Sequence, residues 1–193
     1  MRTKKEQSES RRQQLLDIGL SQFIEYGYHG TSTRKIAEIA GVSSGLMFHY
    51  FPSKEALYLE LIRIGCEVLA HTYKDEPEPF EYFRREADRI YRILEAGSFA
   101  ARMFVFMDMA QFSARFVSDA AAALIGRNTL IQRSAEYVRR GQAQGVIRDG
   151  DPLALSIAFY GALQSVAEWR AGAPEYPVPN REWFLDILRK KQP

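Results

Sequence analysis

A short stretch between residues 33 and 54 concentrates side chains that donate hydrogen bonds or carry positive charge. Hydroxyl, guanidinium, imidazole, phenol and ammonium groups follow one another there. Donors of these types bind phosphate oxygens and the acceptor atoms of nucleic-acid base edges. The candidate contact residues are Thr33, Arg34, Ser44, Gly45, Leu46, Phe48, His49, Tyr50 and Lys54.

The polar members of this set differ in what they can bind. Thr33 and Arg34 begin a short helical pattern, where a hydroxyl, free backbone N–H groups and a guanidinium can meet a phosphate, and Arg34 can instead reach guanine O6 and N7. His49 can donate to a base edge or a phosphate. Tyr50 can donate its hydroxyl to a phosphate, and Lys54 can bind one as a point charge.

Three further positions in the second half of the stretch favour close approach and apolar contact. Gly45 lets a backbone come near a ligand, and Leu46 can touch a thymine methyl group. Phe48 can do the same, but packing against the preceding helix explains this residue equally well. The stretch therefore predicts a surface that reads both polar and apolar features of duplex DNA.

The spacing of apolar residues around these donors predicts two short helices joined by a tight turn. Ile36, Ala37 and Ala40 share one face of the first helix, and Gly41 ends that helix because glycine tolerates a left-handed backbone. Ser43 or Ser44 can cap the second helix, in which Met47 faces inward until Pro52 stops it. This is the layout of a DNA-binding helix-turn-helix. An ordinary helical hairpin has similar spacing.

The flanking sequence resembles the N-terminal domain of the TetR family of transcriptional regulators. Leu46 stands where that family commonly has threonine and Phe48 where it commonly has tyrosine, so two hydroxyl groups are absent here. The resemblance covers roughly the first third of the chain. It is carried by Phe23, Gly27, Tyr28, Thr31, Ser32, Thr33, Arg34, Ile36, Ala37, Ala40, Gly41, Val42, Ser43, Gly45, Tyr50, Phe51, Ser53, Lys54, Glu55 and Leu57.

The elements that must position these residues are helical throughout, because no segment alternates apolar and polar residues as a strand does. We expect an all-α fold of about nine helices: a three-helix helix-turn-helix domain in residues 1–54, a linking helix from 54 to about 73, and a larger helical domain within 55–193. Residues 1–8 are expected to be mobile. Further helices are expected at 9–26, 80–96, 98–116, 118–144, 151–171 and 180–188.

Composition limits the class of protein. The chain of 193 residues has a net charge of +2, but residues 1–54 contain eight Lys or Arg and five Asp or Glu, which places an excess of +3 where phosphate contacts are expected. The single cysteine, Cys66, excludes an internal disulfide. No apolar run reaches bilayer length and the N-terminus lacks a secretory signal, so we expect a cytoplasmic protein.

Chemistry beyond binding has little support in the sequence. His29, His49 and His71 lack the spacing of metal ligands, and neither a glycine-rich phosphate loop nor a Gly-x-Ser-x-Gly motif occurs. We therefore expect no enzyme activity, no metal and no cofactor.

The segment from Ser98 to Phe116 is apolar around most of its circumference. Flexible methionine side chains can line a cavity for varied apolar ligands, and a polar group there can orient a ligand. A close-packed core explains the same pattern, as a salt bridge would explain Arg102 and Asp108. The candidate effector-pocket residues are Tyr91, Met103, Phe104, Met107, Asp108 and Gln111.

The resemblance implies that the C-terminal domain binds a small effector and dimerises through its last two long helices, here about 151–171 and 180–190. A dimer also makes physical sense, since one reading helix makes too few base contacts and two read a pseudo-palindrome. By resemblance the protein is a repressor released by a small apolar effector. The alternative is an all-helical small-molecule-binding or protein-interaction module that binds no operator. Candidate interface residues are Leu155, Ala158, Leu163, Val166, Trp169, Trp183 and Leu185.

Overall fold

The computed structural model describes residues 3–69, 73, 75, 77–96, 98–127, 129–173 and 175–190. These residues form an all-α fold without a strand, as the sequence predicts. The chain divides into two compact units: unit 1 comprises Met1–Val68 and Phe106–Arg127, and unit 2 comprises Leu69–Val105 and Asn128–Pro193. Within the described ranges, no helix is both long and apolar enough to cross a bilayer.

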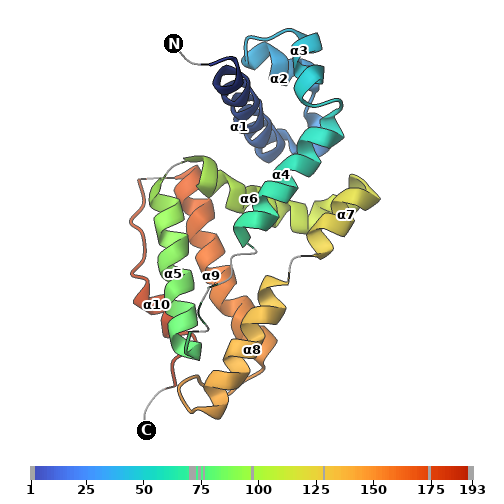
Figure 1. Ribbon diagram of the computed structural model, residues 1–193. Helices are drawn as coiled ribbons and strands as arrows, with labels where there is room; N and C mark the ends of the chain where they lie inside the picture. Colours follow the sequence, from blue (N-terminus) through green and yellow to red (C-terminus); the bar gives the residue numbers. More distant parts are fainter. Residues whose placement is uncertain are drawn as a thin grey trace. The chain divides into compact units, whose positions relative to one another are not determined.

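Unit 1 is built around four N-terminal helices (Figure 1): α1 (Lys4–Gly30), α2 (Thr33–Ile39), α3 (Ser44–Tyr50) and α4 (Lys54–Leu69). It also contains the second half of α6 (Ser98–Ser113), the 3-10 turn η1 (Ala114–Phe116) and α7 (Asp119–Gly126). Gly19 allows α1 to lie close to α4, because a Cβ at this position would come within 2.7 Å of Leu57. The fully buried core residues include Leu16, Leu20, Phe23, Ile36, Met47, Leu57, Leu61 and Ile62.

Unit 2 packs α5 (Pro79–Ala96), α8 (Leu130–Ala143) and α9 (Pro152–Gly172) against one another, with the single turn α10 (Glu182–Leu185) against α5 and α9 (Figure 1). Its core contains a polar cluster that the sequence did not predict. The buried Glu86 carboxylate accepts hydrogen bonds from Arg89, from the Tyr73 hydroxyl at 2.9 Å and from the Tyr160 hydroxyl at 3.1 Å. These partners satisfy a charge that would be costly to bury alone.

The first helix begins earlier than predicted. Residues 4–8 belong to α1, because Thr3 and Glu6 form a capping box in which each side chain binds the other residue's backbone N–H, at 3.2 and 2.8 Å. The predicted start of this helix at residue 9 is therefore wrong, because residues 4–8 are already helical. The predicted end at Gly27 is confirmed as a break: Gly27 has φ +67°, and the helix resumes briefly to Gly30.

Two other helix predictions are wrong. The single helix expected from 118 to 144 is two helices, α7 and α8, because α7 ends at Gly126, a poor helix former, within a polar stretch. The helix expected through Leu188 is only one α-helical turn, although the Asn180 side chain accepts from Glu182 N at 2.9 Å at its start. The predicted end of the linking helix near 73 lies partly outside the described residues, which show α4 as far as Leu69.

Candidate nucleic-acid interface

Helices α2 and α3 form a closed helix-turn-helix corner. Gly41 has φ +65°, and the N–H of Val42 donates to the Ala37 carbonyl at 3.0 Å, which is the hydrogen bond of a glycine-ended helix. The Ser43 hydroxyl accepts from Leu46 N at 3.2 Å and caps α3. Met47 is fully buried and fixes which face of α3 points inward.

The outward face of α3 carries five of the predicted contact residues. Leu46 is 37% exposed and Phe48 is 47% exposed, so about half of the Phe48 side chain is open to a DNA contact. Packing of its covered half against α2 stays the alternative prediction. Single exposed apolar side chains are ordinary, whereas neighbouring ones rimmed by polar residues mark interaction sites. The exposed residues of α3 are Ser44, Gly45, Leu46, Phe48 and His49.

Three other predicted contact residues flank this face. Arg34 is exposed and Thr33 is half-buried at the start of α2, where Ser32 rather than Thr33 supplies the helix cap. The Tyr50 hydroxyl lies 3.2 Å from the Ser8 hydroxyl, a pairing that fixes the phenol next to the start of α1. The capping-box pattern Thr-x-x-Glu was the sequence signal that could have placed Ser8 on a helix.

Lys54 uses two of its three ammonium N–H groups inside the protein, so its predicted phosphate contact stays a prediction for the third. Its ammonium group donates to the carbonyls of Tyr28 and Thr31 at 2.7 and 2.9 Å and lies 4.4 Å from the centre of the Tyr28 ring. Partial burial lowers the pKa of this ammonium group. Thr31 in turn donates its hydroxyl to the carbonyls of Gln22 and Gly27. Lys54 therefore ties the start of α4 to the connection between α1 and α2.

A group of salt bridges also joins α1 to α4. The Glu60 carboxylate pairs with both Arg12 and Arg63. Desolvation alone would raise the pKa of Glu60, but hydrogen bonds and charges from the two guanidinium groups outweigh it and hold the pKa below its ordinary value. Arg12 also lies over the Phe51 ring, 5.3 Å from its centre. This triad was not anticipated from the sequence.

The predicted effector-pocket residues divide between the two units. Tyr91, Met103 and Phe104 belong to unit 2, where the two α6 residues are buried and the Tyr91 hydroxyl donates to the Pro179 carbonyl. Met107, Asp108 and Gln111 belong to unit 1, where Met107 is buried and Gln111 is exposed. Asp108 alone of the six lines a cavity described within one unit, a space of about 360 Å³ in unit 1.

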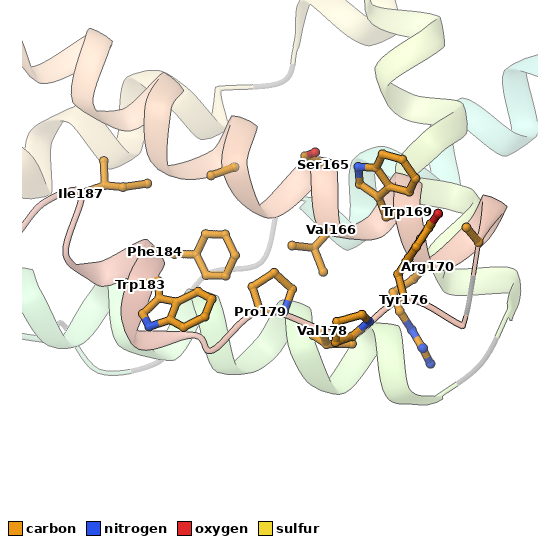
Figure 2. A pocket seen from close by; sticks show the side chains of 13 residues that line it. Ser165, Val166, Trp169, Arg170, Tyr176, Val178, Pro179, Trp183, Phe184 and Ile187 are labelled. Atoms are coloured by element: carbon orange, nitrogen blue, oxygen red, sulfur yellow. The ribbon is translucent and has the colours of Figure 1, made fainter.

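Unit 2 contains a larger apolar groove of about 690 Å³ between the second half of α9 and residues 173–187 (Figure 2). Trp169 and Tyr176 meet edge to face, with ring centres 5.3 Å apart, and Trp183 lies further along the groove. All three side chains are exposed. We call this the tryptophan groove.

Several predicted interface residues lie inside unit 2. Leu163, Val166 and Leu185 are buried in its own core and Leu155 is partly buried, whereas Ala158, Trp169 and Trp183 are exposed. The exposed residues that run along α9 at four-residue intervals form what we call the outer face of α9: Leu153, Ile157, Gly161, Ser165 and Trp169.

A family pattern and a relative of known function both match this chain, and both are bacterial transcriptional regulators. Residues 15–61 match the N-terminal family pattern described as bacterial regulatory proteins, tetR family. The chain is 44% identical over 163 residues to the HTH-type transcriptional regulator RutR of Escherichia coli (strain K12), covering 83% of this chain and 75% of RutR.

Solved structures show the same fold. The ketosteroid transcriptional regulator KstR2 of Mycobacterium tuberculosis superposes with a TM-score of 0.75 at 24% identity, over 94% of this chain and 96% of that one. AibR, solved in complex with isovaleryl coenzyme A and operator DNA, superposes with a TM-score of 0.68 at 18% identity, over 91% and 94% of the two chains.

Proposed function

Because this chain belongs to the TetR family of bacterial regulatory proteins, we propose that it is a cytoplasmic transcriptional repressor that binds a pseudo-palindromic operator as a homodimer. The observation that carries the proposal is the outward face of α3. Its exposed leucine, phenylalanine and histidine sit on a capped helix whose inner face is fixed by the buried Met47. A helix presented in this way enters the major groove with its N-terminal residues nearest the bases.

The proposed DNA contacts are of two kinds: phosphate contacts that position the protein, and base contacts that recognise the sequence. Arg34, Thr33 and the Tyr50 hydroxyl bind phosphates around the groove, while Ser44, Gly45 and His49 approach base edges. Leu46 and Phe48 replace hydroxyl contacts by packing on thymine methyl groups. Lys54 contributes by holding the connection before α2, and any phosphate contact uses its remaining N–H.

The dimer forms through the outer face of α9 and the tryptophan groove. An exposed apolar face of this kind is typical of an interface between subunits. Two reading helices related by a twofold axis then meet half-sites about 34 Å apart, or a related spacing.

A small, largely apolar effector releases the operator. We assign operator binding to residues 1–54 and effector binding and dimerisation to 55–193, with α4 as the connection. AibR, which has been solved with both a coenzyme A thioester and operator DNA, supports two-ligand control in a protein of this fold. A coupling of about 1–3 kcal/mol between the two ligands would change operator affinity roughly 5- to 150-fold.

Selection of bound fragments from a random DNA library tests the proposal and yields the operator. On that operator, Arg34→Ala and Tyr50→Ala should each reduce affinity roughly tenfold, at about 1–3 kcal/mol per lost contact, without unfolding the chain. Arg139→Ala, which removes an equal charge from the exposed side of α8 in unit 2, is the matched control. If both interface variants bind like the control, the contact assignment is wrong.

The competing function is a helical small-molecule-binding or protein-interaction module that ignores DNA. Random duplex DNA separates the two, because a protein that neutralises phosphates loses affinity steeply as salt rises. A chain without measurable affinity for duplex DNA at low salt would favour the competing function.

A further inference from the structure

Unit 1 contains a cavity of about 360 Å³ where α1, α4 and the second half of α6 meet. Its wall includes five aromatic side chains and one carboxylate. The aromatic residues are Phe23, Tyr28, Tyr58, Phe106 and Phe112, and the carboxylate is Asp108. Every one of these residues belongs to the same compact unit.

The aromatic residues form a connected wall. Tyr58 meets Phe23, Tyr28 and Phe106 edge to face, with ring centres 5.1, 5.1 and 5.2 Å apart. Phe23, Tyr58 and Phe106 are buried, so they form the floor, whereas Phe112 is 70% exposed and stands at the mouth. The π faces of such rings carry partial negative charge and attract cations.

Asp108 adds a full negative charge to this wall. The carboxylate is half-buried, and no lysine or arginine among the described residues forms a salt bridge with it. Asp108 therefore places one acidic side chain in a lining that is otherwise mostly aromatic. Lys54 does not neutralise it, because its ammonium group binds two backbone carbonyls and one face of Tyr28.

From this combination we propose that the unit 1 cavity binds a small organic cation, an ammonium group carrying apolar substituents. The rings and Asp108 attract the same sign of charge, and the floor receives the apolar part of the ligand. A neutral apolar molecule would leave the Asp108 charge uncompensated, and an anion would be repelled by it.

Binding at this cavity bears directly on the operator-reading elements. Phe23 and Tyr28 lie on α1, which packs against α2, and Tyr58 lies on α4, whose Lys54 binds the connection before α2. This regulatory consequence rests on the proposed function, in which the cation acts at a second site beside the effector site assigned to residues 55–193, because Phe23 and Tyr28 also line the cavity. The binding itself does not require operator DNA, so the two ideas can fail separately.

The test compares two ligands of the same shape, phenyltrimethylammonium and its uncharged carbon analogue tert-butylbenzene, by equilibrium dialysis against the full chain without DNA. The cation should bind about tenfold more tightly than the neutral analogue, in keeping with ordinary cation–π and charge contributions. Asp108→Asn should remove most of this preference while leaving tert-butylbenzene binding within about twofold. Asp119→Asn, which removes an exposed carboxylate from α7 in the same unit, should change neither.

A second variant tests the rings without altering charge. Phe112→Leu keeps an apolar side chain at the mouth but removes its π face, so it should weaken the cation by about threefold and leave the neutral ligand unchanged. The proposal is overturned if the wild-type chain binds neither ligand, if it binds both equally, or if Asp108→Asn and Asp119→Asn have the same effect on the cation.

Discussion

At the scale of single residues, Lys54 has hydrogen bonds inside the protein that its position in the sequence did not predict. Its position after the second helix predicted a point charge for phosphate. In the folded chain two of its three N–H groups are already used by the carbonyls of Tyr28 and Thr31. Sequence alone could not reveal this, because the accepting carbonyls are more than twenty residues away.

Salt dependence distinguishes a residue that contacts DNA from one that positions the contact surface. Lys54→Met should lower operator affinity roughly tenfold by loosening the connection before α2, yet keep the slope of log affinity against log salt. Arg34→Ala should reduce the magnitude of that slope by about 0.9, the value for one phosphate contact. Fluorescence anisotropy with labelled operator at several KCl concentrations measures both. An equal loss of slope in the two variants would make Lys54 a phosphate contact.

The Arg12–Glu60–Arg63 triad predicts how stability depends on pH. Because the pKa of Glu60 is lower in the folded than in the unfolded chain, its contribution is fully present above the unfolded value of about 4.3 and is lost as pH falls through the folded value.

Glu60→Gln should therefore destabilise the chain by about 1–3 kcal/mol at pH 7, since two guanidinium groups lose their partner. Its difference from wild type should shrink as the pH drops below about 4. Urea denaturation at pH 7, 5 and 3.5 gives the comparison, with Glu136→Gln on the exposed side of α8 as the control. A difference that stays constant across this range would show that charge is not the cause.

At the scale of elements, helices were predictable where strong local signals stand beside apolar periodicity. The sequence predicted a helix over 151–171 and the end of α2 at Gly41, and the structure confirms both. Asp151 caps α9, with Pro152 in its first turn. Helix boundaries were predicted wrongly where only a weak local signal, such as a capping residue, set the start or end of the helix. Thr3 and Glu6 begin α1 inside a wholly polar stretch, so periodicity gave no sign of a helix there.

Within the helix-turn-helix corner, we expect stability to be most sensitive to substitution at Gly41, where the backbone is left-handed. Gly41→Ala should lower the free energy of unfolding by about 1–2 kcal/mol because a Cβ is strained at φ +65°. Gly126→Ala at the end of α7, where φ is not positive and a Cβ would meet nothing within 4 Å, should be neutral or slightly stabilising. Guanidinium denaturation of both variants provides the measurement. Equal effects would mean that backbone strain does not decide the outcome.

At the scale of the whole molecule, the inward side of α9 could not be chosen from sequence, since the helix is apolar on nearly every side. The predicted interface mixed buried residues such as Leu163 and Val166 with exposed ones such as Trp169. The structure separates them by burial. The six predicted pocket residues divide between the two units because α6 contributes to both, and their binding of an effector stays a prediction.

The outer face of α9 gives a direct test of the dimer. Ile157 is 58% exposed, so Ile157→Glu should leave the subunit folded but convert a dimer to a monomer by placing two charges in the interface. Gln132→Glu on the exposed side of α8 adds the same charge elsewhere. Sedimentation velocity at micromolar concentration reports the mass. An Ile157→Glu protein that sediments like the control would place the interface on another surface.

The tryptophan groove also determines the origin of this protein's intrinsic tryptophan fluorescence. Both tryptophans of the chain, Trp169 and Trp183, line that one groove, and unit 1 contains neither. Emission excited at the red edge of protein absorbance therefore comes from unit 2 alone. A change in that emission when unlabelled operator is added would be a direct optical readout of communication between the two units, with no dye attached.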